Sequence, residues 1–293
     1  MSNFSDTVYG APGHIQLDVA IISRQGGRNY NEDACGHWHS DHHLTCVVAD
    51  GAGGHGGGDI ASKLAVRHII ERNAQDPVNS GASVHELILD TNRTIHQHRQ
   101  QGGVREHMHS TVVALFIELD TQTALWGHVG DSRLYVFRRG QLRMQTRDHS
   151  LVQSLVDGGL IKPEQMRSHA QRSELLCALG SQEEDLHIGV SHDPWVIAPG
   201  DVFLLCTDGL WEYVDEAVLQ QSLMQARDPR EWLSTLEALV LRNAAHKPSH
   251  DNFSALTVWA LDDGLRYTKR TMTHAFSTGF APVFRLTLAS GKT

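Results

Sequence analysis

Cysteine is scarce in this sequence, and long apolar runs are missing. Four cysteines occur in 293 residues, and no two of them form a CxxC pair, which argues against a disulfide framework or a zinc site built on cysteine. No segment approaches the ~18 apolar residues of a membrane-spanning helix, and the N-terminal residues are polar, unlike a signal peptide. We therefore expect a cytoplasmic protein without a membrane span.

An excess of positive charge is also lacking. Lys and Arg number 25 against 34 Asp and Glu, which gives a formal net charge of −9. Nucleic acid is not expected as the main partner, because phosphate backbones require a basic face. The exception is residues 264–293, where basic residues occur without any acidic one. We expect one domain over residues 1–263 and a basic C-terminal tail of unassigned role over residues 264–293.

Strand and helix patterns occur in clusters. Runs that are β-branched or alternate in polarity predict strands at 15–23, 44–49, 111–119, 123–129, 132–138, 202–207 and 255–261. Helical periodicity predicts helices at 58–73, 83–99, 150–158, 163–169, 215–226 and 228–245. Because the two kinds do not alternate strictly, we expect an α+β fold rather than a parallel sheet with crossover helices.

Four aspartates adjoin apolar runs. Asp50, Asp131 and Asp208 each end such a run and precede a small residue, and Asp251 opens another. Singly, each is more often a turn residue. If strands of one sheet bring them to a common rim, however, the carboxylates would repel one another without a cation. Mg²⁺ and Mn²⁺ prefer such oxygen ligands, and the absence of a Cys/His ligand spacing argues against zinc.

Two further segments add candidate ligands. Arg28 precedes Glu32 and Asp33, so a guanidinium able to bind phosphate with two hydrogen bonds lies beside two more carboxylates. The alternative is a surface loop with a local Arg28–Glu32 ion pair. Residues 51–58 include six glycines, which allow a close approach of the Gly51 carbonyl to an ion. The alternative here is a flexible connector.

Taken together and in their order along the chain, these residues and the segments around them resemble the metal-dependent protein phosphatases of the protein phosphatase 2C (PPM) family. The resemblance covers about residues 15–261, is closest to the bacterial branch, and within it is similar to phosphatases encoded with type VI secretion systems. The matching segments are Arg28 with Glu32-Asp33, Val48-Ala49-Asp50-Gly51, Ser110-Thr111, Gly130-Asp131-Ser132-Arg133, Asp148-His149-Ser150, Ala178-Leu179-Gly180, Asp208-Gly209-Leu210-Trp211 and Asp251-Asn252.

The resemblance implies a central sandwich of two antiparallel sheets flanked by helices on both faces, with residues 1–263 as the catalytic domain. It implies hydrolysis of phosphoserine and phosphothreonine in proteins by a water activated by two Mn²⁺ or Mg²⁺ ions. The expected partners are a phosphorylated protein and the bacterial Ser/Thr kinase that this enzyme would oppose. Asp50 would bridge the two ions and the Gly51 carbonyl would bind one, while Asp208 and Asp251 would complete one ion's shell.

The resemblance also implies roles for the remaining candidates. Glu32 and Asp33 would act partly through water, and Arg28 would hold the substrate phosphate. Asp131, together with Asp208, matches the position that holds a third, weaker ion in bacterial relatives. The expected catalytic residues are thus Arg28, Asp50 and Asp131.

Two positions depart from the family pattern. Eukaryotic members often place a histidine, a proposed proton donor to the leaving group, directly after the Asp-Gly pair. This chain has Ala52 there, with His55 in a different register. Members usually have arginine where this chain has Cys177, which follows the variable flap at about residues 150–178.

Two other interpretations compete with a metal-dependent phosphatase. Gly130-Asp131-Ser132 could belong to a serine hydrolase, but the chain has no Gly-x-Ser-x-Gly elbow. A phosphoprotein-binding scaffold without turnover is the second alternative, and the presence of every expected metal carboxylate argues against it.

Overall fold

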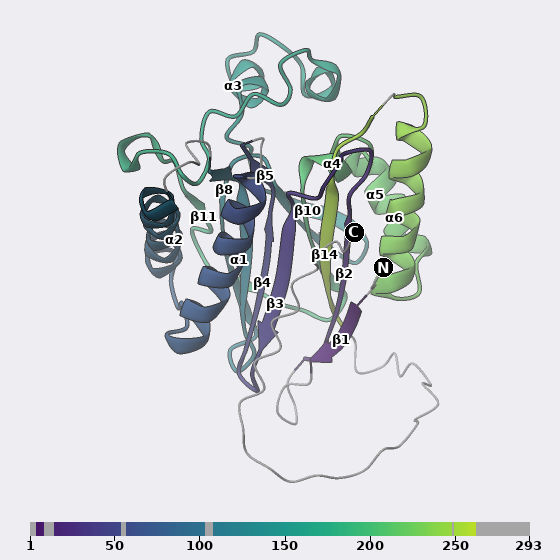
Figure 1. The fold of residues 1–293 in the computed structure, drawn as a ribbon. Helices are drawn as coiled ribbons and strands as arrows, with labels where there is room; N and C mark the ends of the chain where they lie inside the picture. The colour runs from purple at the N-terminus through teal and green to yellow at the C-terminus, as the bar shows by residue number, and fades with distance from the viewer. Residues whose placement is uncertain (1–3, 9–14, 54–56, 103–107, 248, 262–293) are drawn as a thin grey trace.

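The computed structural model describes residues 4–8, 15–53, 57–102, 108–247 and 249–261, in which two antiparallel sheets pack face to face (Figure 1). The first sheet has the order β1 (Phe4–Val8), β2 (Leu17–Arg24), β14 (Phe253–Ala260), β13 (Asp201–Cys206), β9 (Arg133–Arg138), β10 (Gln141–Gln145). The second has the order β11 (Gly189–Val190), β8 (Thr123–Val129), β7 (Val112–Glu118), β4 (His43–Ala49), β3 (Ala34–His39), and β12 (Trp195–Val196) also pairs with β8. A separate short pair joins β5 (Gly51–Ala52) to β6 (His109–Ser110).

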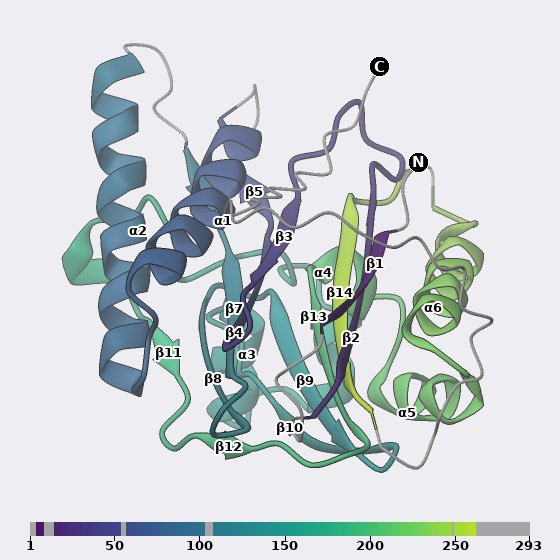
Figure 2. The same ribbon diagram turned by 90° about the horizontal axis from the view of Figure 1, so that it is seen from below.

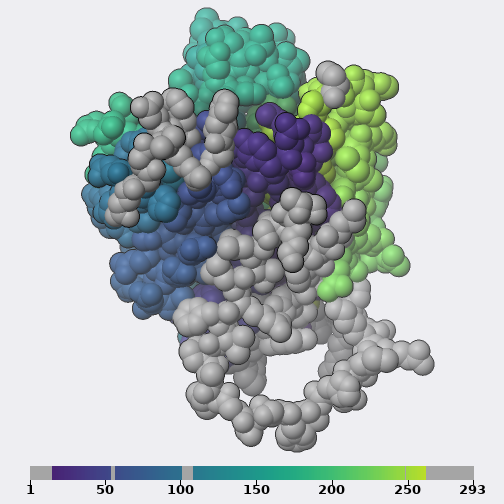
Figure 3. All heavy atoms as spheres, in the orientation of Figure 1, coloured from purple at the N-terminus to yellow at the C-terminus, as the bar shows by residue number. Residues whose placement is uncertain are grey.

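Helices cover the outer face of each sheet. Helices α1 (Gly58–Gln75) and α2 (Gly81–Gly102) lie on the second sheet, and α5 (Glu216–Gln225) and α6 (Pro229–Ala244) lie on the first, as the view from below shows (Figure 2). The short helix α4 (Asp208–Trp211) follows β13 directly. Helix α3 (Leu151–Asp157) and the 3-10 helix η1 (Pro163–Ser168) form a cap at one end of the sandwich (Figure 3), and η2 (Glu183–Asp185) follows them in the chain.

The strands read as continuous apolar runs because both of their faces are buried. In β13, Phe203 and Leu205 point into the core between the sheets, whereas Leu204 and Cys206 pack under α5 and α6. In β7, alternate residues divide in the same way between the inter-sheet core and the core under α1 and α2. Period-two alternation therefore stabilises three apolar layers at once.

The structure confirms the predicted α+β sandwich and its principal elements. All seven predicted strands are present within two residues of their predicted bounds, and residues 163–169 form a 3-10 turn rather than an α-helix. The sequence analysis did not predict β1, β3, β10, the two-residue strands or α4. Strand β10 lies at a sheet edge and is mostly polar, so it lacks an apolar pattern.

The basic tail lies outside the described residues, and the boundary at residue 263 stays a prediction. Among the helices in the described ranges, none is both long and apolar enough to cross a membrane.

Candidate metal centre

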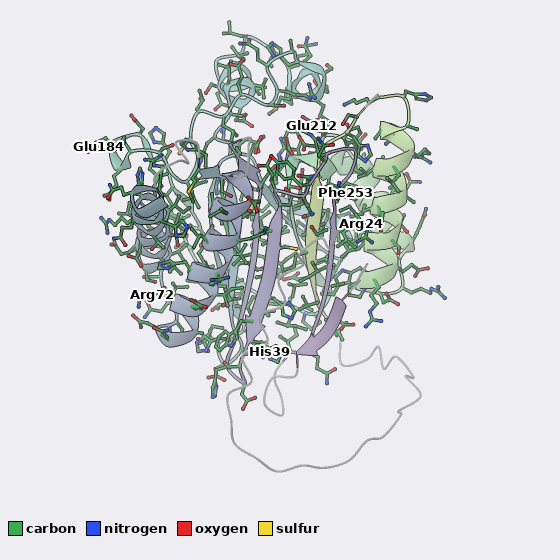
Figure 4. The ribbon with its side chains drawn as sticks, viewed as in Figure 1. Arg24, His39, Arg72, Glu184, Glu212 and Phe253 are labelled. Atoms are coloured by element: carbon green, nitrogen blue, oxygen red, sulfur yellow. The ribbon has the colours of Figure 1, made fainter. Side chains whose placement is uncertain are left out.

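The predicted acidic residues lie at the end of the sandwich under the α3 cap. Asp50 follows β4, Asp131 connects β8 to β9, Asp208 opens α4 after β13, and Asp251 precedes β14. In Figure 4, Glu212 marks this end of the molecule and His39 lies at the other. The expectation that one sheet supplies the rim is wrong in one respect: Asp50 comes from the second sheet, and Asp208 and Asp251 come from the first.

Burial and mutual repulsion raise the pKa values of these carboxyls. The Asp33 side chain is only 2% exposed, and burial, followed by repulsion from Asp208 and Asp251, raises its pKa to about 8. Burial also raises the pKa of Asp50 well above its usual range, and Asp33, Asp208 and Asp131 add to the shift. The carboxyls therefore lie close enough to repel one another strongly.

The same causes act on the other members of the cluster. Burial, then repulsion from Glu212 and Asp251, raises the pKa of Asp208 to about 7, although a hydrogen bond between the Asp50 and Asp208 side chains lowers it in part. The pKa of Asp131 is raised by burial and then by Asp208. Burial also raises the pKa of Glu32. Buried carboxylates that repel one another in this way cannot all stay charged without compensation, so the cluster must bind either protons or cations.

Three buried carboxylate oxygens indicate which ligand fits. Glu32 Oε1, Asp33 Oδ1 and Asp208 Oδ1 are buried and accept no hydrogen bond from the described residues. Buried polar atoms without a partner are costly, and hard divalent cations bind carboxylate oxygens of this kind. The donor set therefore fits Mg²⁺ or Mn²⁺.

The side chains are gathered but are not yet arranged around one point. Within the described ranges, no three Asp, Glu, His or Cys side chains form a group that could hold an ion as they stand. Asp33 Oδ2 accepts from Thr207 Oγ1 at 3.1 Å, and Asp251 Oδ2 accepts from Arg28 Nη2 at 2.5 Å. An ion would compete with these protein donors, and the carboxylates would have to rotate toward it.

Gly51 allows the backbone to pass through this crowded region. A Cβ added to Gly51 would lie 2.3 Å from the Gly58 carbonyl oxygen, which excludes any side chain. Its N–H donates to the Glu32 carbonyl at 3.2 Å. The close approach to Gly58 joins β5 to the start of α1, and the hydrogen bond joins β5 to the segment that carries Glu32 and Asp33, so Gly51 and Gly58 act here as packing contacts.

Arg28 lies at the solvent-facing edge of the centre. Its side chain is 53% exposed and pairs with Asp251, which is distant in the sequence. The ion pair therefore joins two segments, in contrast to the alternative of a local pair with Glu32. An exposed guanidinium beside the acidic cluster is available to a ligand that enters from solvent.

Two buried supports had no assigned role in the sequence analysis. The Asn252 side chain is 4% exposed, accepts from Glu32 N at 2.9 Å, and donates to the carbonyls of Gln25 and Tyr30 at 2.6 and 3.0 Å. It thereby fixes the loop that carries Arg28 and Glu32. The signal in the sequence that could have identified Asn252 is its position directly after Asp251.

The second support lies beneath Asp131. Arg133 donates two hydrogen bonds to Asp148, at 2.8 and 2.7 Å, and its guanidinium carbon lies 3.6 Å from the centroid of the Trp211 ring. Trp211 Nε1 donates to the Asp131 carbonyl at 2.9 Å. The matching segments around Asp131, Asp148 and Trp211 thus meet in one buried contact.

The structure also bears on the serine-hydrolase alternative and on the two positions that depart from the family pattern. Ser132 is 1% exposed and its hydroxyl bonds to Thr111 Oγ1 at 2.7 Å, so it is not placed as a nucleophile. Cys177, which stands where the resemblance implies an arginine, is buried, and its sulfur accepts from His187 N at 3.1 Å. His55 lies outside the described residues.

Comparisons with known proteins agree with this geometry. The chain is 31% identical over 239 residues to the serine/threonine phosphatase stp of Listeria innocua, covering 79% of this chain and 90% of that one. The solved structure of PppA, described as a key regulatory component of T6SS in Pseudomonas aeruginosa, matches with a TM-score of 0.67 and 30% identity, over 87% of this chain and 100% of that one.

A solved structure with metal matches as well. The catalytic domain of the serine threonine protein phosphatase PstP, in complex with two manganese ions, has a TM-score of 0.69 and 27% identity, over 85% of this chain and 100% of that one. The family model for protein phosphatase 2C matches residues 23–251. Because that match spans most of the chain and includes every candidate metal ligand from Glu32 to Asp251, the protein belongs to the protein phosphatase 2C family.

Proposed function

We infer that this protein hydrolyses phosphoserine and phosphothreonine in proteins with the help of divalent metal ions. The observation that carries the inference is the cluster of buried carboxyls with raised pKa values, three of whose oxygens lack a hydrogen-bond donor. An acidic protein that binds phosphate needs a source of positive charge at the site. Family membership and the relatives named as serine/threonine phosphatases support the same activity.

We propose the following distribution of ligands. Asp50 would be shared between two ions, the Gly51 carbonyl would bind one of them, and Asp208 and Asp251 would complete one shell. When bound, such ions lower the pKa of a water that attacks phosphorus and offset the charge of the phosphate. The manganese ions of the PstP structure support this proposal; Mn²⁺ and Mg²⁺ are both compatible with the donor set.

The outer part of the centre would have supporting roles. Glu32 and Asp33 would bind partly through water, and Asp131 with Asp208 would hold a third, weaker ion. The raised pKa of Asp131, caused by burial and by Asp208, supports the last assignment, since a further carboxylate at the rim favours a further cation.

Arg28 would bind the substrate phosphate. Its planar guanidinium can donate two hydrogen bonds to phosphate oxygens, and its exposure leaves it accessible from solvent while Asp251 holds it at the rim. Asn252 would position this loop through its three hydrogen bonds.

We further propose that the enzyme acts in the cytoplasm and reverses a bacterial Ser/Thr kinase, since a kinase that uses ATP would supply its substrate. We also propose that it acts beside a type VI secretion system, and its similarity to PppA supports this proposal. Residues 1–263 would form the catalytic domain, and residues 264–293 would be dispensable for the chemistry.

A phosphate-release assay tests the function. Phosphoserine and phosphothreonine peptides would be incubated with the full chain in Mn²⁺, in Mg²⁺ and in excess EDTA, and turnover is expected only with a metal. Asp50→Asn should abolish it, whereas Asp193→Asn, an exposed aspartate between β11 and β12, should not. Full activity in EDTA, or none with either metal, would refute the proposed function.

A further inference from the structure

The short helix α4 connects two of the candidate metal ligands. Its first residue is Asp208 and its last is Trp211, and the Trp211 indole donates to the Asp131 carbonyl at 2.9 Å. The Asp208 and Asp131 carboxyls lie near each other, because Asp208 adds to the rise that burial causes in the pKa of Asp131. The position of this one helix therefore sets the separation of the two residues proposed to hold the third ion.

The Trp211 side chain is held firmly from below. It is 1% exposed, and the guanidinium carbon of Arg133 lies 3.6 Å from the centroid of its ring. Asp148 holds Arg133 in turn, through two hydrogen bonds at 2.8 and 2.7 Å. With the ring fixed in this way, the remaining freedom of α4 lies at its backbone, at the end that faces the flap.

An arginine of the flap binds that end. Arg167, in η1, donates through Nε to the Trp211 carbonyl at 2.8 Å and through Nη2 to Glu216 Oε1 at 2.7 Å. The last carbonyls of a helix have no partner within it, so the guanidinium caps α4 and joins it to the start of α5. Glu216 Oε1 also lies 3.5 Å from Arg133 Nη1, so one carboxylate contacts both arginines.

The burial of this contact distinguishes it from another ion pair of the flap. The side chains of Arg167 and Glu216 are 24% and 29% exposed. Arg147, by contrast, is 67% exposed where it pairs with Asp157 of α3, and ion pairs so open to solvent contribute little. The Arg167 contact is therefore the stronger of the two, and it is the one that reaches α4.

The flap has a further contact near α4, which would remain if Arg167 were replaced. Arg172 Nε lies 2.7 Å from an oxygen of Glu212, the residue that follows α4 (Figure 4). Loss of the Arg167 side chain would thus remove the cap of the helix without releasing the flap from this part of the molecule.

We propose that Arg167 is a positioning residue that holds α4 where Asp208 and Asp131 can bind the third ion together. The proposal rests on the proposed function, from which it takes the third ion and its two ligands. In this role Arg167 contacts neither the ion nor the substrate. It acts through the Trp211 carbonyl, and the Trp211 indole transmits the constraint to the segment that carries Asp131.

Calorimetric titration of the metal-free full chain with Mn²⁺ tests the assignment without turnover. Arg167→Gln should leave two tight binding steps unchanged and raise the Kd of the third, weaker step about tenfold, a typical coupling between two sites. Glu216→Gln, which weakens the hold on the same guanidinium, should shift that step by a smaller factor. Arg147→Gln is the matched control, because it removes a flap ion pair with Asp157 of α3, and all three of its steps should equal those of the wild type.

Hydrolysis of a phosphothreonine peptide gives a second readout. At the Mn²⁺ concentration that just saturates the wild type, Arg167→Gln should have a reduced kcat, and raising Mn²⁺ about tenfold should restore it, because mass action refills the weakened site. A general loss of structure would not be rescued in this way. In the Asp131→Ala background, Arg167→Gln should reduce kcat no further, since residues that act through one site are not additive.

The outcomes separate this role from the function on which it rests. An unchanged third step in both Arg167→Gln and Glu216→Gln, or an equal shift in Arg147→Gln, would overturn the role of Arg167. A wild-type chain with only two binding steps would overturn it together with the third-ion assignment. A wild-type chain whose third step responds to Arg167→Gln as expected, but which releases no phosphate from the peptide, would refute the proposed function instead.

Discussion

The metal-free protein should lose stability as pH rises above neutrality, in the opposite sense to ordinary carboxylates. Asp33 has a pKa raised from 3.8 to about 8, and Asp208 from 3.8 to about 7, in each case chiefly by burial. The folded state then keeps protons that the unfolded state has released. A group with a raised folded pKa contributes stability that is lost as pH rises through that value.

The pH window must exclude the buried histidines. Burial lowers the pKa of His149 from 6.5 to about 4 and also lowers that of His128. Below about pH 6.5 these rings take up protons only on unfolding, so stability falls as pH decreases there. Above that value the rings lose their remaining protons in the unfolded state, which offsets a small part of the decline, and the carboxyls dominate the slope.

The expected magnitude follows from these two carboxyls. Integrating the proton difference from about pH 6.5 to about pH 8 gives about 2 kcal/mol of lost stability from Asp33 and Asp208 together, at 1.36 kcal/mol for each unit of pKa. For a chain of this size, that corresponds to a fall of roughly 5 °C in Tm. Asp50 and Asp131 have pKa values raised in the same direction and would add to it.

Differential scanning calorimetry in EDTA across this window measures the effect. Asp33→Asn should flatten the slope, because the amide cannot ionise. Saturating Mn²⁺ should remove the decline, since ions replace the protons and stabilise the native state by mass action. A Tm in EDTA that is constant or increases from about pH 6.5 to about pH 8 would refute the reasoning that these carboxyls share a buried, cation-free cluster.

Three further changes separate the proposed roles. Arg28→Ala should lower kcat/KM about 10- to 100-fold, because it removes a charge-assisted hydrogen bond to the phosphate. The Mn²⁺ stoichiometry, measured by mass spectrometry, should not change; loss of metal would mean that Arg28 is needed for the ions rather than for the phosphate. Asp131→Ala should keep two tightly bound ions and the fold yet reduce kcat, whereas a turn aspartate would cost up to ~1 kcal/mol of stability and leave kcat alone. Deleting residues 264–293 should leave p-nitrophenyl phosphate hydrolysis nearly unchanged, and a collapse in soluble yield would show that the tail packs on the domain.

Much of the fold could be predicted because the principal strands are buried on both faces. Runs such as those of β4 and β13 are mainly apolar and are followed within two residues by an aspartate, so both the strand and the candidate ligand are visible in the sequence. Strand β3 was missed because histidines and a glycine interrupt its apolar pattern at the sheet edge. Periodicity predicts an element from its own residues and gives no information on its partners.

The parts of the site that depend on pairing could not be predicted. Gly51 and Ser110 each lie in a two-residue strand, and their register is set by contacts between segments far apart in the chain. The packing of the two sheets, which brings carboxylates from both of them together, could not be predicted from the sequence either. Nor could the role of Asn252, whose three side-chain hydrogen bonds all reach the loop before β3.

Diffraction at the manganese absorption edge tests the central claim most directly. Crystals of the full chain grown with Mn²⁺ should give two strong anomalous peaks between the segments that carry Asp50, Asp208 and Asp251, with a weaker third peak near Asp131. The Asp33, Asp208 and Glu32 oxygens that now lack donors should turn toward them or toward their waters. Ordered, unpaired carboxylates with no anomalous peak at saturating Mn²⁺ would contradict the account.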